Sequence, residues 1–364
     1  MDNPSISLCM IVKDEAEYLP KCLQSAAPIV DEIIIVDTGS TDDTVAIAES
    51  FGAKVIHMPW PNSFAAARNR SLEEATGDWI LWLDADEAID TEEAGKLKEL
   101  LGRDLVRQQH IEGIQFQFLN YTRDSVETVP LQRMIRNRPE YRFEGVIHEQ
   151  ILPSMQNSHA NCTVGDVDIH VHHYGNLPEI LLGKDKIRRN LNLLHQALSN
   201  DPKDTVPFYY LGVEYYRVNA LEQALKSFNH FLANSSNTTS VVMLSSAHKF
   251  RLLVLQLMER YTDLVQQGME SIGLFPDYTD LYHLVASGWK ELQRPDKAIK
   301  ALQKALKIGP AVGPYASMQG IGTYQTAHAL AELFNSIGNA EQAGVYYAQA
   351  QAMKSGIVSD VKPE

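Results

Sequence analysis

GDWILWLDADE, residues 77–87, is the stretch that decides the fold. Its apolar run at residues 79–83 contains no polar side chain, and such a run is typical of a strand buried on both faces of a parallel sheet. The run ends in the acids Asp84, Asp86 and Glu87. Open parallel sheets bind ligands just beyond the carboxyl ends of their strands, and clustered carboxylates repel one another unless a cation lies among them. We therefore expect a divalent metal ion at this strand end.

Strands and helices alternate along the whole first half of the chain. Buried strands are predicted at residues 6–12, 31–36, 53–58 and 77–83, with helical patterns between them. This alternation predicts an α/β domain with a mixed, mostly parallel sheet. The sequence contains neither GxGxxG after the first strand nor GxxxxGK[ST], which argues against a dinucleotide-dependent dehydrogenase and a P-loop ATPase.

Three segments in order carry a family resemblance: ISLCMIVKDE (residues 6–15), VDTGSTDDT (36–44) and FAAARNRSLEEATGDWILWLDADE (64–87). Together they resemble family 2 glycosyltransferases of the GT-A fold, the Rossmann-like fold of nucleotide-diphospho-sugar transferases. The resemblance covers roughly the first quarter of the chain and is specific as a set. It implies a nucleotide-sugar donor, expected to be UDP-linked, and a divalent cofactor, Mg²⁺ or Mn²⁺.

The resemblance also implies roles for single residues. Asp37 is expected to contact the nucleotide base, Arg68 to lie near the base or diphosphate, and Asp84 to contact the ribose. Asp86 is expected to bind the metal ion, and Glu15 is a further donor-binding candidate. The chemistry agrees, because a divalent ion on the diphosphate neutralises the charge that develops on the leaving group. Acids two apart in an extended segment also point the same way.

Four of these residues have a purely structural interpretation as well. Asp37 could bond to the backbone of its own turn, and Arg68 could be a solvated helix arginine. Glu15, like the Asp86-Glu87 pair, could be an acid of the first turn of the following helix, where negative charge is favourable.

The sequence that follows residue 102 changes to a period of two. Residues 111–121, 129–136 and 141–152 are predicted to be extended, as mixed or antiparallel edge strands. A basic cluster falls in this region: Arg133, Arg136, Arg138 and Arg142. These arginines either face the diphosphate or an acceptor, or are solvated at the sheet edge.

An inverting sugar transfer needs a carboxylate that removes the acceptor proton. The family places this base after the strand that ends in its DxD motif, here Asp84-Ala85-Asp86, often as a Glu-Asp pair or a similar acid, and this chain has no clear Glu-Asp pair there. Ile-His-Glu at residues 147–149 is the nearest counterpart, so Glu149 is the predicted base, with Glu144 and His148 in reserve. A zinc HExxH motif is excluded because Leu152 stands where the second histidine belongs.

Three histidines lie within residues 170–173. Alternation along a strand puts His170 and His172 on one face and His173 on the other. Some GT-A enzymes add a late histidine to the metal, and the HHYG segment resembles that placement. His173 is therefore the predicted extra metal ligand; the alternative is a strand with surface or packing histidines.

The second half of the chain reads as all-helical. Residues 208–228, 282–310 and 330–350 fit the tetratricopeptide (TPR) pattern of ~34 residues, with a degraded copy at 248–276. We expect a GT-A catalytic domain at residues 1–177 and a TPR-like superhelical domain at 178–364. Stacked helix pairs form a concave surface that binds polypeptides or a second copy of the chain, so a polypeptide partner or a homodimer is expected; a structural cap is the alternative.

Composition narrows the setting. The net charge of −14 argues against a nucleic-acid partner. The acidic start does not resemble a secretory signal, and no apolar run approaches the ~18 residues of a transmembrane helix. Three widely spaced cysteines without a CxxC pair fit a reducing compartment. We expect a cytoplasmic protein without a transmembrane segment.

These inferences favour a metal-dependent inverting glycosyltransferase that uses a UDP-hexose. Similar architecture occurs in enzymes that glycosylate peptides, including bacteriocin cysteine and serine glycosyltransferases, so a peptide or protein side chain is the preferred acceptor. A transferase for lipopolysaccharide core or another surface glycan is the first alternative, because such enzymes share the KDEA, DTGSTD and DADE segments. A TPR scaffold with an inactive transferase fold is the second; the presence of Asp37, Arg68, Asp84 and Asp86 argues against it.

Overall fold

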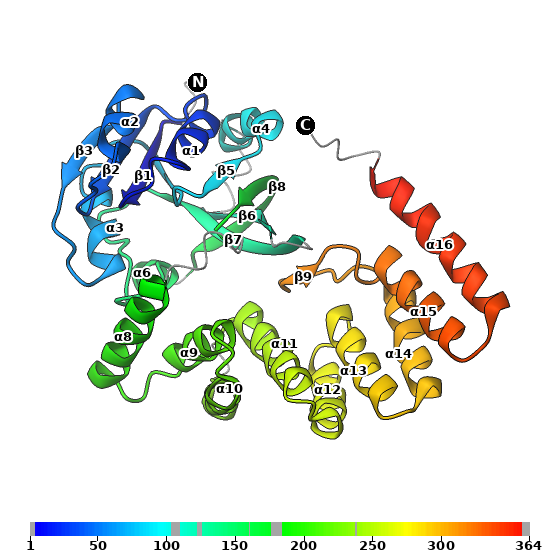
Figure 1. Ribbon diagram of the computed structural model, residues 1–364. Helices are drawn as coiled ribbons and strands as arrows, with labels where there is room; N and C mark the ends of the chain where they lie inside the picture. The colour runs from blue at the N-terminus through cyan, green and yellow to red at the C-terminus, as the bar shows by residue number, and fades with distance from the viewer. Residues whose placement is uncertain are drawn as a thin grey trace. The chain divides into compact units, whose positions relative to one another are not determined.

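The computed structural model describes residues 4–102, 110–121, 126–159, 161–175, 184–236 and 239–358. The chain divides into two compact units, Met1–Asp201 and Pro202–Glu364, whose elements are labelled in Figure 1. The boundary expected between residues 177 and 178 lies outside the described residues. Helix α8 (Lys184–Asn200), which the sequence assigns to the second domain, groups with the first unit. Its Arg189 lies over the Phe64 ring, 5.0 Å from the centroid, and so packs α8 onto that unit.

The first unit alternates strands and helices as predicted. In chain order its elements are β1 (Ile6–Val12), α1 (Leu19–Ala26), β2 (Glu32–Asp37), α2 (Thr44–Ser50), β3 (Lys54–His57), α3 (Phe64–Leu72), β4 (Trp79–Trp82), β5 (Glu87–Ile89), α4 (Thr91–Gly102), β6 (Ile111–Tyr121), β7 (Val126–Arg136), α6 (Leu152–Ser158), β8 (Thr163–His173) and α8. The three-residue strand β5, directly after the acidic motif, is the one described strand of this unit that the sequence did not predict.

These strands form one mixed sheet in the order β3-β2-β1-β4-β7-β6-β8-β5. β1 runs parallel to β2 and β4, and β2 runs parallel to β3. β7 is antiparallel to both β4 and β6, whereas β8 is parallel to β6 and antiparallel to β5. The predicted mixed sheet is confirmed, but β6 and β7 lie inside it and not at its edge. All four residues of β4 are buried, as expected for a central strand.

Residues 141–152 are not the predicted strand. They form a loop that is closed by one isolated bridge, between Glu144 and Gln150, and helix α6 begins at Leu152. The left-handed backbone of Gly145 (φ 95°) and His148 (φ 52°) breaks the extended conformation. Pro153 then lies in the first turn of α6, a position that favours the start of a helix.

The described part of the second unit is built of helix pairs, which confirms the predicted TPR-like array. The pairs are α9 (Val206–Arg217) with α10 (Leu221–Asn234), α11 (Val241–Leu257) with α12 (Tyr261–Leu274), α13 (Thr279–Glu291) with α14 (Pro295–Ile308), and α15 (Tyr324–Ser336) with α16 (Ala340–Val358); the short strand β9 (Ser317–Met318) precedes the last pair. Close packing explains the small residues of the repeat. A Cβ added at Gly212 would lie 2.6 Å from the Phe228 ring, so only glycine fits between α9 and α10.

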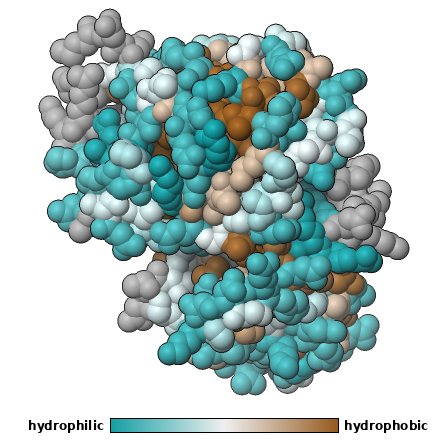
Figure 2. Space-filling model, turned by 90° about the vertical axis from the view of Figure 1, so that its left-hand side faces the viewer, coloured by the Kyte–Doolittle hydropathy of each residue, from teal (hydrophilic) through white to brown (hydrophobic). Residues whose placement is uncertain are grey.

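One face of the molecule is mostly hydrophilic (Figure 2). Figure 2 shows one face, on which hydrophilic residues predominate and hydrophobic residues gather in patches. Each helix in the described ranges is too short or too polar to cross a bilayer.

Candidate functional site

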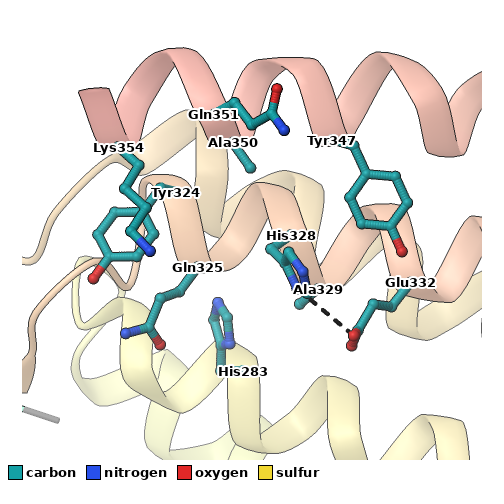
Figure 3. A pocket seen from close by; sticks show the side chains of 10 residues that line it. All are labelled: His283, Tyr324, Gln325, His328, Ala329, Glu332, Tyr347, Ala350, Gln351 and Lys354. Atoms are coloured by element: carbon teal, nitrogen blue, oxygen red, sulfur yellow. Dashed lines mark ion pairs between the residues drawn. The ribbon is translucent and has the colours of Figure 1, made fainter. Parts of the chain in front are cut away.

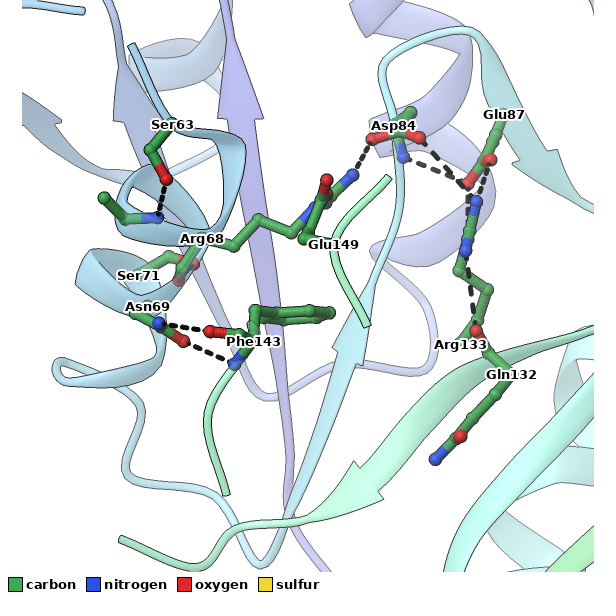
Figure 4. A network of polar contacts seen from close by, with 11 residues as sticks. Ser63, Arg68, Asn69, Ser71, Asp84, Glu87, Gln132, Arg133, Phe143 and Glu149 are labelled. Carbon is green, nitrogen blue, oxygen red and sulfur yellow. Dashed lines mark hydrogen bonds and ion pairs between the residues drawn. The ribbon is translucent and has the colours of Figure 1, made fainter. Parts of the chain in front are cut away.

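Helix α3 carries Arg68 to the carboxyl end of β4. The helix is capped by Ser63, whose Oγ accepts a hydrogen bond from Ala66 N at 3.2 Å. Arg68 is buried, and its guanidinium lies between two carboxylates (Figure 4). Its Nη2 donates to Asp84 Oδ1 at 2.6 Å, and its Nε donates to Glu149 Oε1. The structure thus brings three predicted site residues into one network.

The loop that carries Glu149 is held against α3. Asn69 Nδ2 donates to Phe143 O at 2.9 Å, and Phe143 N donates to Asn69 Oδ1 at 2.8 Å. Further along the loop, Phe64 N donates to Val146 O at 2.9 Å. These bonds position a loop without regular secondary structure, which explains how Glu149 reaches Arg68 from a distant part of the sequence.

A second arginine, Arg133 of β7, completes the network. It binds Glu87 bidentately, with Nη2 2.7 Å from Oε1 and Nε 3.1 Å from Oε2. The same Nη2 lies 3.7 Å from Asp84 Oδ2. Glu87 Oε2 also accepts from Asp84 N at 3.0 Å. Glu87 is therefore a buried counter-ion of strand β5 and not the first acid of a helix.

The other arginines of the basic cluster make different contacts. Arg138 binds Glu112 at 2.6 and 2.7 Å, Arg136 Nε donates to Ile111 O at 3.1 Å, and Arg142 Nη1 donates to Tyr141 O at 2.8 Å. Of the two interpretations left open for this cluster, the site-facing one therefore fits Arg133.

The two aspartates of the DxD motif have opposite electrostatic environments. Burial by itself would raise the pKa of Asp84, but the Arg68 and Arg133 guanidiniums overcome it and hold that pKa below its ordinary value. Burial raises the pKa of Asp86; the His173 ring opposes the shift, and the charges of Asp84 and Glu87 add to it. Asp84 has its cations within the protein, whereas Asp86 is an acid whose ionised form would be stabilised by an added cation.

Asp86 and His173 face each other across a small space. His173 Nε2 lies 3.8 Å from Asp86 Oδ2. A Cβ at Gly175 would lie 2.2 Å from that Oδ2 and 2.7 Å from that Nε2, so glycine keeps this space free of a side chain. Across the sheet, His173 Nδ1–H donates to Asn120 Oδ1 at 2.6 Å. A carboxylate and an imidazole so placed suit a divalent ion.

The described protein side chains alone do not complete a metal centre here. Within the described ranges, no group of three or more histidine, cysteine, aspartate or glutamate side chains is arranged to hold a metal ion. Asp86 and His173 therefore fit an ion that takes its remaining ligands from a bound diphosphate and from water, as Mg²⁺ commonly does.

The predicted alternation of the histidines is confirmed. His170 Nδ1 pairs with Glu93 Oε2 at 3.0 Å, and His172 Nε2 lies 3.3 Å from Asp90 Oδ2. Both contacts are with the α4 side of the sheet, whereas His173 faces Asp86.

Asp37 is the last residue of β2, and Glu15 lies in the segment that follows β1. Asp37 accepts from Ser40 N at 3.0 Å and from Gly39 N at 3.2 Å, so its carboxylate organises its own turn. Burial raises the pKa of Asp37, but these hydrogen bonds outweigh it and leave the pKa lowered. Glu15 N donates to Thr44 Oγ1 at 2.7 Å. Asp37 therefore bonds to the backbone of its own turn, as its structural interpretation states. Its contact with the nucleotide base stays a prediction.

Glu15 belongs to the acidic side of the site. Burial, and then the charges of Asp86 and Asp84, raise its pKa to about 7. It precedes α1, which begins at Leu19, so it is not an acid of that helix's first turn. The charges of both aspartates of the DxD motif act on Glu15, and its role in donor binding stays a prediction.

Sequence reasoning missed Asn120 and the pairing of Glu87 with Arg133. The first follows from strand register, because His173 of β8 lies opposite Asn120 of β6; the second is a side-chain contact between β5 and β7. The polar Asn120, at an otherwise apolar face of a strand, was the one signal available in the sequence.

Comparisons with known proteins give a family match for the first part of the chain. The family described as "Glycosyl transferase family 2" matches residues 7–151. A TPR repeat-containing protein of Synechococcus elongatus is 39% identical over 215 residues, which are 57% of this chain and 51% of that protein. The SPbeta prophage-derived glycosyltransferase SunS of Bacillus subtilis is 31% identical over 242 residues, which are 63% of this chain and 54% of SunS. The matches thus span about half the length of each relative.

Among solved structures, the crystal structure of MamA covers 48% of this chain and 93% of its own, with 18% identity and a TM-score of 0.41. The segment that matches the family model contains Arg68, Asp84, Asp86 and Glu149, whose roles stay predictions. Residues 7–151 of this chain match the family 2 glycosyltransferase model, and an array of TPR-like helix pairs follows the matched segment.

Proposed function

We propose that this chain is a metal-dependent, inverting glycosyltransferase that transfers a hexose from a UDP-sugar to a side chain of a peptide or protein. The observation that carries the proposal is the end of β4, where a buried arginine network adjoins the space between Asp86 and His173. A nucleotide diphosphate needs both features, since it carries charge on its phosphates and hydroxyl groups on its ribose.

Arg68 has a donor left over for such a ligand. Its Nη1 is buried and has no hydrogen-bond partner among the described residues, while Nε and Nη2 bind Glu149 and Asp84. A buried donor without a partner costs ~1–3 kcal/mol. An oxygen of the donor that accepts from Nη1 removes this cost, which supports a contact between Arg68 and the diphosphate or nucleoside.

The ionised Asp84 is suited to accept a hydrogen bond from a ribose hydroxyl. Its pKa is held low by two guanidiniums, so it stays an acceptor over the physiological pH range. Asp37 and Glu15 lie at the ends of neighbouring strands and are proposed to contact the base and the nucleoside.

Asp86 and His173 would hold the divalent ion. When bound, Mg²⁺ or Mn²⁺ supplies Lewis-acid stabilisation of the leaving diphosphate. His173 contributes Nε2 because its Nδ1–H is engaged with Asn120, and Asp86 contributes a carboxylate that Gly175 leaves accessible.

Glu149 is proposed to remove the proton of the acceptor. The acceptor's O–H or S–H proton passes to the carboxylate as the acceptor atom bonds to the anomeric carbon and the bond to the diphosphate oxygen breaks. Oε1 of Glu149 accepts from Arg68, so the proton would be taken by Oε2. The same contact suits a second role, in which Glu149 positions Arg68.

A polypeptide acceptor is supported by the second unit. It contains a cavity of about 530 Å³ between α13, α15 and α16. Tyr324 and Lys354 lie at one end, and Tyr347 and Glu332 lie at the other (Figure 3). Aromatic side chains with a charge of each sign suit a peptide, whose side chains offer apolar surface and both charges.

Turnover of nucleotide sugars tests the proposal. The full chain is incubated with a panel of UDP-, GDP- and ADP-sugars and Mn²⁺, and release of the nucleotide diphosphate is measured. We expect Mn²⁺-dependent hydrolysis of one UDP-hexose. A chain that turns over no donor, with or without metal, would contradict the proposal.

Truncation tests the role of the helical unit. Removal of Pro202–Glu364 keeps α8 with the first unit, to which it belongs. We expect transfer to a polypeptide acceptor to fall much more than donor hydrolysis. Equal losses in both activities, with the truncated chain folded by circular dichroism, would favour a structural role for the helices.

A further inference from the structure

Asn120 is a buried amide whose position is set by strand pairing. It is 8% exposed and lies directly opposite His173 in the parallel pair of β6 and β8. Residues opposite each other on neighbouring strands share a face of the sheet, and the two side chains meet there: His173 Nδ1 lies 2.6 Å from Asn120 Oδ1.

This contact determines which nitrogen of His173 carries the proton. An amide oxygen only accepts hydrogen bonds, so Nδ1 must be the donor. In a neutral imidazole the other nitrogen, Nε2, then carries the lone pair. Nε2 is the nitrogen that faces Asp86 Oδ2, at 3.8 Å, across the space left by Gly175.

The neighbouring histidine shows what this arrangement adds. His172 Nδ1 lies 2.7 Å from the hydroxyl of Tyr121, and its Nε2 lies 3.3 Å from Asp90 Oδ2. Both of its ring nitrogens are occupied within the protein. His173 has one nitrogen occupied by Asn120 and the other directed at the acid of the DxD motif.

We propose that Asn120 is a positioning residue that fixes the tautomer and ring orientation of His173, so that Nε2 and the Asp86 carboxylate face a divalent cation together. The inference rests on the metal site of the proposed function and extends it by one residue. Partners of this kind orient the ligand imidazole, and their loss typically weakens metal binding ~10–100-fold.

Three variants of the full chain test this assignment. Asn120→Leu removes the acceptor at nearly constant volume, and Asn120→Asp keeps an acceptor oxygen. Tyr121→Phe is the matched control, because it deletes a hydrogen bond to a histidine of the same strand pair on the opposite face. Mn²⁺ affinity is measured in the presence of UDP from the electron paramagnetic resonance signal of free Mn²⁺, and the His173 tautomer is read from ¹⁵N chemical shifts.

We expect Asn120→Leu to weaken Mn²⁺ binding ~10–100-fold and to lose the Nδ1–H tautomer. Asn120→Asp and Tyr121→Phe should bind Mn²⁺ nearly as the wild type does, and metal-free UDP affinity should not change in any variant. Wild-type Mn²⁺ affinity in Asn120→Leu, or equal weakening in Asn120→Asp and Asn120→Leu, would overturn the role of Asn120 but not the proposed metal site. A wild-type chain that binds no Mn²⁺ with UDP would overturn the proposed metal site as well.

Discussion

Replacement of Arg68 by methionine should destabilise the first unit strongly. The Arg68 side chain is 9% exposed and that of Glu149 is 8% exposed, so the variant leaves a buried carboxylate without its counter-ion. Breaking a buried ion pair on one side costs ~3–5 kcal/mol. This is a large part of the ~5–15 kcal/mol by which a typical domain is stable. The loss of Arg68 destabilises the charge of Asp84 less than that of Glu149, because Asp84 is more exposed and Arg133 Nη2 lies 3.7 Å from its Oδ2.

The double variant Arg68→Met/Glu149→Leu separates charge from packing. It removes both members of the pair, and replacing a buried ion pair by apolar side chains is often nearly neutral. We therefore expect it to regain most of the stability that Arg68→Met alone loses. Urea unfolding followed by tryptophan fluorescence measures both, in a Trp289→Phe background, since the remaining tryptophans, Trp60, Trp79 and Trp82, all lie in the first unit. A loss below about 1 kcal/mol for Arg68→Met, or a double variant as unstable as the single one, would refute the reasoning.

Two further predictions concern Glu149 and His283. Glu149→Gln keeps an oxygen that accepts from Arg68 Nε, so the fold and UDP affinity should persist while the transfer rate falls at least ~10²-fold; transfer near the wild-type rate would leave Glu149 only its positioning role. Burial lowers the pKa of His283, in the second unit, to about 4. Below pH 6.5 the unfolded chain therefore binds a proton at His283, whereas the folded chain binds it only near pH 4. His283 should therefore contribute a fall of about 1.4 kcal/mol per pH unit in the free energy of unfolding as the pH drops from 6.5 towards 4, beside the fall from His248, whose pKa burial also lowers to about 4. Trp289 fluorescence should report a shallower pH dependence for His283→Gln, and identical slopes would exclude this residue as the cause.

The α/β architecture was predictable because burial on both faces leaves a plain mark on the sequence. β1, β2 and β4 contain apolar runs at residues 8–12, 33–36 and 79–82, and polar residues follow each run at one edge of the sheet. The TPR-like helices were predictable for a similar reason, since small residues recur wherever paired helices touch, as at Gly212.

The loop that carries Glu149 could not be predicted in the same way. Its conformation depends on bonds to α3, a helix more than 70 residues earlier, through Asn69 and Phe143. Local sequence favoured a strand there, and tertiary contacts together with a left-handed backbone at His148 overrode that preference. Glu149 was named from the sequence, but its pairing with Arg68 was not.

The partners of His173 were hidden for a related reason. Asn120 lies 53 residues away in the sequence, and only the register of β6 and β8 brings the two side chains together. The register contains irregularities, between Ile111 and Gly113 and between Gln115 and Gln117. A pairing at constant register would therefore not have placed Asn120 opposite His173.

The most direct test of the account is the effect of Mn²⁺ on UDP binding, measured by calorimetry in the wild type, Asp86→Asn and Asp90→Asn. Asp90 is the matched control, because it is an acid four residues further on that contacts His172 on the opposite face. We expect Mn²⁺ to tighten UDP binding in the wild type and in Asp90→Asn but not in Asp86→Asn. An equal effect of Mn²⁺ in Asp86→Asn, or no UDP binding by the wild type in Mn²⁺, would contradict the claim that this strand end binds a metal and a nucleotide diphosphate.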